Sequence, residues 1–181
     1  MKTIQKLSVV VAVAITIMAS ISNAATIING GKVYFKGEIV NAACAVDSES
    51  INQTVPMGQV KATIFKAAGD TSDAQNFSIR LNNCDTSVSK NAAFSFLGTT
   101  TGDDEILSIS GTTAGGAKNV GISIYDMKGD KIKVDGSAFG AKIALIEGTN
   151  VIPLKARYVS TAASVTAGQA DAVASFNIQY D

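Results

Sequence analysis

The sequence predicts an all-β domain built as a sandwich of short strands. No helical periodicity persists beyond residue 24, and short alternating or apolar runs recur instead. Turn sequences such as Met127–Asp130 and Glu147–Asn150 separate these runs, and many short strands with frequent turns are typical of β-sandwiches. The expected strands are Val33–Asn41, Gln53–Lys61, Gln75–Asn82, Ala92–Leu97, Ile106–Ser110, Val120–Asp126, Lys131–Val134, Lys142–Ile146, Val151–Val159 and Ala172–Tyr180. Residues 61–74 leave room for a short helical turn.

The first 24 residues are typical of a secretory signal peptide. Lys2 and Lys6 provide a positive start, residues 7–18 form an apolar run, and Ser22–Ala24 offers a small-residue cleavage site. A transmembrane anchor is the alternative, but the apolar run is short for a span and no basic flank follows it. Cleavage after Ala24 leaves 157 of the 181 residues, which is enough for one domain with a sizeable core.

The charge balance argues against a nucleic-acid partner. The chain has 15 basic and 15 acidic residues, and the signal peptide contains two of the basic ones and no acidic one. The mature chain therefore has a net charge of −2. It lacks the basic excess that would attract nucleic acid or an anionic membrane.

The sequence contains two cysteines, Cys44 and Cys84. In an exported protein an even number of cysteines indicates a disulfide. This one would close a loop of about 40 residues and contribute roughly 4 kcal/mol on the chain-entropy account. A zinc site is the alternative, but two cysteines without any histidine are too few soft ligands. We therefore expect no metal and no cofactor.

The residue types that most enzymes need are missing. The chain has no His and no Trp, so a Ser-His-Asp or Cys-His arrangement is impossible. The carboxylates of residues 103–105 could bind calcium or act as paired acids, although a solvated loop is the simpler interpretation. The Gly-rich stretch 113–121 lacks the P-loop spacing and a following helix. We expect no enzymatic activity.

The stretch that precedes the first cysteine alternates like a strand. From residue 31 on, one face is apolar or glycine and the other is mostly polar. Asn29-Gly30 is a hairpin-turn signal, yet a hairpin would have only residues 25–28 as its first arm. We therefore favour one extended strand, and because it precedes Cys44 the disulfide does not hold it down.

The last strand has the clearest alternation in the chain. Ala172, Ala174, Phe176, Ile178 and Tyr180 share one face, and the intervening residues share the other. Chain ends are usually frayed and polar, so a terminus this regular should belong to a sheet. An ordinary last strand of a closed sandwich would give the same pattern.

Several stretches carry the pattern of a known family. They are "NGGKVYFKGEIVNAACAVD" (29–47), "LNNCD" (81–85) and "GTNVIPLKARY" (148–158), with the penultimate Tyr180 and with Gly168, fourteenth from the end. Because of these residues, the whole mature chain resembles the chaperone–usher pilins. The resemblance is close to the major subunit of type 1 fimbriae. The middle loops, about 99–118, are less diagnostic.

The resemblance implies an incomplete immunoglobulin-like sandwich that lacks its final strand. An apolar groove between the first and the C-terminal strand would be filled by a donor strand from another chain. A periplasmic chaperone would supply that strand first. At the outer-membrane usher the N-terminal extension of the next subunit would replace it, which is strand addition across chains.

The resemblance also assigns regions and residues. Residues 1–24 would be the signal peptide, 25–43 the N-terminal extension and 44–181 the pilin domain. The donor-strand residues would be Ile27, Gly31, Val33, Phe35, Gly37 and Ile39. The acceptor groove and chaperone docking site would comprise Gly168, Ala174, Phe176, Ile178, Tyr180 and Asp181.

The expected function is that of a major structural subunit of type 1-like fimbriae, which forms a head-to-tail homopolymer carrying an adhesin. Its partners would be the chaperone, the usher and minor tip pilins, and it would be exported through the periplasm of a Gram-negative bacterium. Two alternatives are a minor adaptor or terminator pilin and a monomeric secreted carbohydrate-binding module. The chain is too short for a tip adhesin with a separate binding domain.

Overall fold

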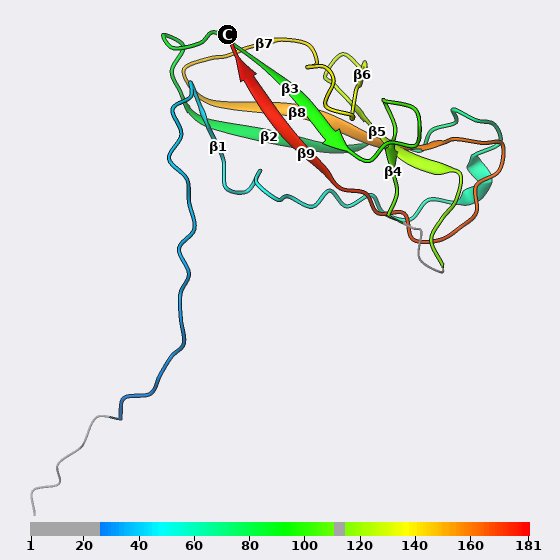
Figure 1. The fold of residues 1–181 in the computed structure, drawn as a ribbon, viewed down its shortest axis with the longest axis horizontal. Coiled ribbons are helices and arrows are strands. Elements are labelled where there is room, and N and C mark those ends of the chain that lie inside the picture. The colour runs from blue at the N-terminus through cyan, green and yellow to red at the C-terminus, as the bar shows by residue number, and fades with distance from the viewer. Residues whose placement is uncertain (1–25, 111–114) are drawn as a thin grey trace, which may run out of the picture. The chain divides into compact units, whose positions relative to one another are not determined.

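The computed structural model describes residues 26–110 and 115–181, so the expected signal peptide lies outside the described residues. The chain divides into two units, residues 1–38 and 39–181. All the strands described below belong to the second unit (Figure 1). Within the described ranges, no helix is long and apolar enough to cross a membrane.

The second unit contains two antiparallel sheets. The larger runs in the order β1 (Ala45–Val46), β2 (Gln75–Cys84), β8 (Gly148–Ser160), β5 (Val120–Tyr125) and β4 (Leu107–Ser108), and β6 (Lys131–Ile132) also pairs with β5. The smaller has the order β7 (Ile143–Ala144), β3 (Asn91–Gly98) and β9 (Ala174–Tyr180). In Figure 1, β3 and β9 lie across β2 and β8 as the second layer of a sandwich.

The core forms because inward and outward positions alternate along the long strands. On β8, residues Ile152, Leu154 and Ala156 are buried, while Val151, Pro153 and Lys155 are exposed. This is the period-2 pattern of a sheet with one face in the core. The buried side chains meet Phe94 and Phe96 of β3 and the rest of one apolar cluster. Each large side chain buried in this way contributes roughly 1.5–3 kcal/mol.

The expected disulfide is confirmed. Cys44 and Cys84 are bonded, and both are almost fully buried. Cys44 immediately precedes β1, and Cys84 is the last residue of β2. The bond therefore links the segment that leads into β1 to the end of β2 in the larger sheet.

The expected strands from residue 75 onward are all present, although β4, β6 and β7 are shorter than expected. The short helical turn within 61–74 is present as η1 (Ala62–Ile64). The expected strand Gln53–Lys61 is wrong, because residues 53–60 have no ladder partner. Pro56 has no N–H to donate, and Gly58 has a φ of +68° that a strand does not allow.

Residues 26–40 form no strand in the single chain, and their side chains are exposed. The Asn29-Gly30 hairpin is not formed either. A type I′ turn would need a positive φ at both residues, and among the described residues only Asn52, Asn83, Asn119 and eight glycines other than Gly30 have one. The expectation that this stretch joins a sheet of a neighbouring chain stays a prediction.

Candidate functional site

The last strand has one free edge. β9 pairs with β3 along its whole length, from Gly98↔Ala174 to Ala92↔Tyr180. Across the described ranges, residues 174–180 make no backbone hydrogen bond outside this ladder. The second edge of β9 therefore presents unpaired N–H and C=O groups, which are a template for another strand.

The inward face of β9 is only partly covered. Its partner β3 is buried at Phe94 and Phe96. By contrast, the four inward side chains of β9 are only half-buried although they pack against the core cluster; they are Ala174, Phe176, Ile178 and Tyr180. In a closed sandwich these positions would be as buried as those of β3. The core is open along this strand.

Phe176 shows how the open face joins the core. Its ring lies beside that of Phe96, with centroids 6.4 Å apart and planes tilted by 48°. This is a favourable arrangement for an aromatic pair. One side of the Phe176 ring is thus packed, and the side away from Phe96 remains available to another apolar group.

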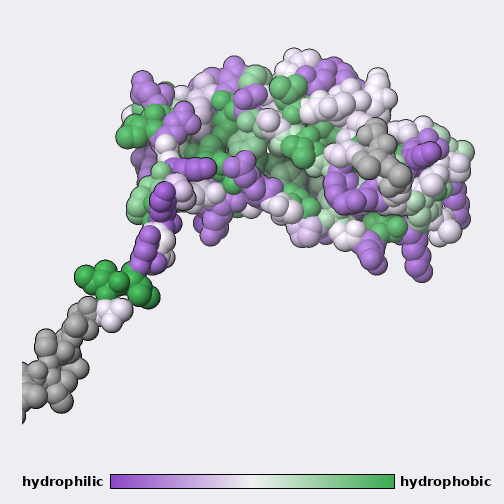
Figure 2. Space-filling view, turned by 60° about the horizontal axis from the view of Figure 1, so that its bottom comes forward, coloured by the Kyte–Doolittle hydropathy of each residue, from purple (hydrophilic) through white to green (hydrophobic). Residues whose placement is uncertain are grey.

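The opposite border of the open face is formed by the segment that follows β1. Val46 and Met57 are half-buried and pack against the same core cluster. In Figure 1 this segment runs below β9. Figure 2, which brings that side forward, shows apolar side chains gathered in a hollow with polar side chains along its borders. We call this the acceptor groove, bounded by β9 and residues 47–60.

Tyr180 and Asp181 lie at one end of the acceptor groove. The Tyr180 hydroxyl donates to the Cys44 carbonyl oxygen at 3.4 Å, and burial raises the pKa of this phenol. The Asp181 carbonyl oxygen accepts from the Lys90 and Asn91 N–H groups at 3.0 and 2.9 Å, and its side chain is ion-paired with Lys142. The end of β9 is thereby fixed next to the disulfide.

Gly168 lies before β9, outside the strand. A Cβ at this position would come within 2.4–2.5 Å of backbone atoms of residues 115–117. Gln169 also pairs with this segment, since the Ala117 N–H donates to its carbonyl oxygen at 2.9 Å. The structure therefore gives Gly168 a packing role, and its predicted role in the groove stays a prediction.

The predicted donor residues are exposed. Phe35 is 92% exposed and Ile39 100%, and Ile27 and Val33 are also among the exposed large apolar residues. A Cβ added at Gly31 or Gly37 would meet no atom within 4 Å other than those of its neighbours in the chain. Alternate apolar side chains in water are a liability unless they are covered by a partner.

The sequence does not indicate every residue of the groove. Val46 and Met57 carry no signal of their own, because an apolar residue at the border of an open core looks the same in the sequence as one in a closed core. Lys142, which pairs with Asp181, carries no signal at all, because its partner lies 39 residues further along the chain.

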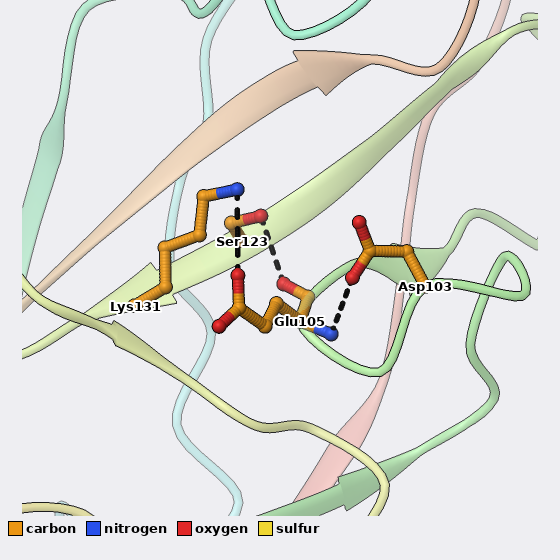
Figure 3. Close-up of polar contacts among 4 residues, drawn as sticks. All are labelled: Asp103, Glu105, Ser123 and Lys131. Carbon is orange, nitrogen blue, oxygen red and sulfur yellow. Dashed lines mark hydrogen bonds and ion pairs between the residues drawn. The ribbon is translucent and has the colours of Figure 1, made fainter.

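The carboxylates of residues 103–105 have structural partners, and Figure 3 shows those of Asp103 and Glu105. Asp103 accepts from the Glu105 N–H at 2.9 Å, and Glu105 is paired with Lys131 at 3.6 Å. Asp104 pairs with Lys133 at 2.6 Å, which raises the pKa of that lysine. In the described parts of the chain no three His, Cys, Asp or Glu residues gather as metal ligands would. The Ser123 hydroxyl of β5 also donates to the Glu105 carbonyl oxygen at 2.9 Å, so these contacts hold the loop against β5 and β6.

Comparison with known proteins decides the family. The model of the family described as "Fimbrial protein" matches residues 33–181. The chain belongs to the fimbrial protein family. It is 46% identical to the type-1 fimbrial protein, A chain, of Escherichia coli strain K12 over 180 residues, which cover 98% of both chains. The fimbrial subunit type 1 of Klebsiella pneumoniae gives the same identity and coverage.

Solved structures support the same fold. The P pilus rod subunit PapA has 26% identity and a TM-score of 0.66, and the match covers 77% of this chain and all of that one. A chaperone–usher pilus structure that concerns rod uncoiling has 30% identity, a TM-score of 0.71, and coverage of 87% and 100%. This fimbrial protein therefore has the incomplete immunoglobulin-like sandwich of the pilins and is a major structural pilus subunit, in a family without enzymatic function.

Proposed function

We propose that this pilin polymerises by donor-strand exchange, in which residues 27–39 of one subunit fill the acceptor groove of the next. One observation carries the proposal. The same chain has a strand, β9, with an open edge and a partly covered apolar face, and a segment with exposed apolar side chains at alternate positions. The open strand lacks a neighbouring strand, and the exposed segment lacks a sheet to pair with.

The donor segment is suited to such a groove. In an extended chain Ile27, Gly31, Val33, Phe35, Gly37 and Ile39 point to one side. Covering Val33 and Phe35 would contribute roughly 1.5–3 kcal/mol each, and pairing with the free edge of β9 would add backbone hydrogen bonds. Gly31 and Gly37 would sit where the two backbones approach closely.

The contact runs head to tail. A subunit has one donor segment and one acceptor groove, so its two binding surfaces differ. A heterologous contact that does not close on itself generates a filament. One kind of subunit is therefore enough to build an extracellular fibre.

The open groove also explains the need for assembly partners. A seven-residue strand with a free edge and an apolar face is an aggregation hazard before assembly. A periplasmic chaperone that lends a strand would cover the groove, with Tyr180 and Asp181 at its docking end, and an outer-membrane usher would direct the exchange. Minor tip pilins that carry the adhesin would use the same groove-and-strand contact.

The test is a pair of substitutions on opposite faces of the donor segment. Phe35→Asp would place a charge in the groove, and burying an unpaired charge is strongly unfavourable. Tyr34→Asp adds the same charge on the other face. We expect Phe35→Asp to abolish fibres on the cell surface, with the Cys44–Cys84 bond intact, and Tyr34→Asp to retain them. Normal fibres from Phe35→Asp would overturn the proposal.

A further inference from the structure

Asn29 is placed in an unusual chemical setting. It is the one asparagine in the sequence that is followed by glycine, and it lies in the exposed extension, where no strand forms. A Cβ added at Gly30 would meet no atom within 4 Å other than those of its neighbours in the chain. Across the described ranges, no hydrogen bond engages the Gly30 N–H. The Gly30 nitrogen is thus sterically open and free to move.

A hydrogen bond makes the Asn29 side-chain amide more reactive. The Gly31 N–H donates to Asn29 Oδ1 at 3.0 Å. This bond draws electron density from Asn29 Cγ and holds the amide over the backbone that follows it. Cγ is therefore more electrophilic than in a side chain without this bond.

We propose that Asn29 is a site of spontaneous deamidation, open while the extension is free and protected once the extension is inserted into a neighbouring subunit. The Gly30 nitrogen attacks Cγ, a new C–N bond forms, and the side-chain amide leaves as ammonia. A water molecule then opens the cyclic imide at either carbonyl, which yields aspartate or isoaspartate. One water is consumed, one ammonia is released, and nothing is oxidised or reduced.

The protection, which rests on the proposed function, follows from strand pairing. In a ladder, the backbone of Gly30 is held extended and its nitrogen cannot reach Cγ. Asn29 shares the alternating face of Gly31 and Val33, so its side chain would also be covered. In a subunit that assembles promptly, Asn29 is not deamidated. In a subunit whose extension stays free, Asn29 is converted.

The product would be a poorer donor. An aspartate at position 29 carries a charge to the apolar side of the strand, where it has no partner. An isoaspartate adds a carbon to the backbone, which moves Ile27 out of register with Val33. Deamidation would therefore remove aged subunits from the pool that can assemble.

The first experiment compares free and inserted extensions. The free form is the full chain with its groove filled by a copy of residues 25–39 that carries Asn29→Gln and is fused after Asp181. The inserted form is the fibre. Both are incubated at mildly alkaline pH, which favours the attacking nitrogen, and mapped by peptide mass and retention. Asn41, which is also exposed but precedes Ala42, is the internal comparison.

We expect Asn29 to convert in the free form while Asn41 stays unconverted, and we expect neither to convert in the fibre. Gly30→Ala should prevent most of the conversion. If Asn29 converts no faster than Asn41 in the free form, the deamidation site is overturned and donor-strand exchange is untouched. If Asn29 converts equally in fibre and free form, insertion does not cover residue 29, which overturns the protection and counts against the proposed function.

A second experiment tests the consequence. Asn29→Asp reproduces one product, and Asn41→Asp adds the same charge outside the donor segment. We expect Asn29→Asp to assemble at least about tenfold more slowly than the wild type, because its charge is buried without a partner, and Asn41→Asp to assemble normally. Assembly of Asn29→Asp at the wild-type rate would overturn the link between deamidation and donor function.

Discussion

At the scale of single residues, Gly168 is where one added methyl group should cost most. Its Cβ would meet the Gly116 carbonyl carbon at 2.4 Å and the Gly115 oxygen at 2.5 Å, and backbone atoms cannot rotate away. We expect Gly168→Ala to lower the free energy of unfolding by about 1–3 kcal/mol, the usual range for overpacking. Chemical denaturation of the monomer with its groove filled by a fused donor strand measures this change.

The matched control is Gly140→Ala in the same domain. Its nearest contact would be the Phe94 carbonyl oxygen at 3.5 Å, an ordinary van der Waals distance. We expect no loss of stability, or a gain of up to about 1 kcal/mol from the stiffer unfolded chain. Equal losses at both positions would show that the close approach at Gly168 is not the cause.

Asp70 should make the domain sensitive to acid. Its carboxylate accepts the Ala67 N–H at 2.8 Å and the Lys66 N–H at 2.6 Å, and these bonds lower the pKa of Asp70 below its ordinary value of 3.8. A pKa that is lower in the folded state stabilises the fold above the unfolded pKa, and that contribution is lost as the pH falls through the folded pKa. The pKa of Asp47 is lowered mainly by the Glu49 N–H, and the pKa values of Asp85 and Asp135 are lowered mainly by hydrogen bonds with the Ser87 and Ser137 side chains.

We expect Asp70→Asn to be less stable than the wild type at neutral pH, with the difference disappearing in strong acid. Denaturant unfolding at a series of pH values measures this, and Asp73→Asn, at an exposed aspartate three residues away, is the control. A stability difference that stayed constant from neutral to strongly acidic pH would show that the carboxylate charge is not responsible.

At the scale of elements, the sequence pattern is most informative where one strand has one buried and one exposed face. Strict alternation predicts β2, β8 and β9, and an apolar run predicts β3. Residues 53–61 alternate too, but Pro56 and Gly58 prevent a ladder. The openness of the groove cannot be derived from periodicity, because a half-buried and a fully buried face of β9 show the same alternation; the family resemblance is needed for it.

The open edge of β9 should accept a strand supplied in the same chain. A copy of residues 25–39 fused after Asp181 through a flexible linker would cover the half-buried side chains of β9. Two or three large apolar side chains at about 1.5–3 kcal/mol each should raise the melting temperature of the monomer by about 10 °C or more. The measurement is calorimetry of the fusion and of the parent.

A fusion whose copied strand carries Phe35→Asp is the control, since it has the same length and linker. We expect it to melt close to the parent. If the unaltered copy melts no higher than the parent, the sandwich is already closed and no strand is missing.

At the scale of the whole molecule, the two binding surfaces that polymerisation needs, the groove and the donor segment, can be placed on separate chains. A chain that lacks residues 25–37 retains the groove and has no donor segment. A chain with the fused copy has its groove filled and retains a free extension. Because a filament needs both surfaces on every subunit, neither chain should form multimers alone, whereas a mixture should give dimers and nothing longer.

Denaturing gels without prior boiling in acid resolve these species from the wild-type ladder. Multimers beyond the dimer would mean that a second contact links subunits, and a mixture that stays monomeric would mean that residues 25–37 are not the strand that enters the groove.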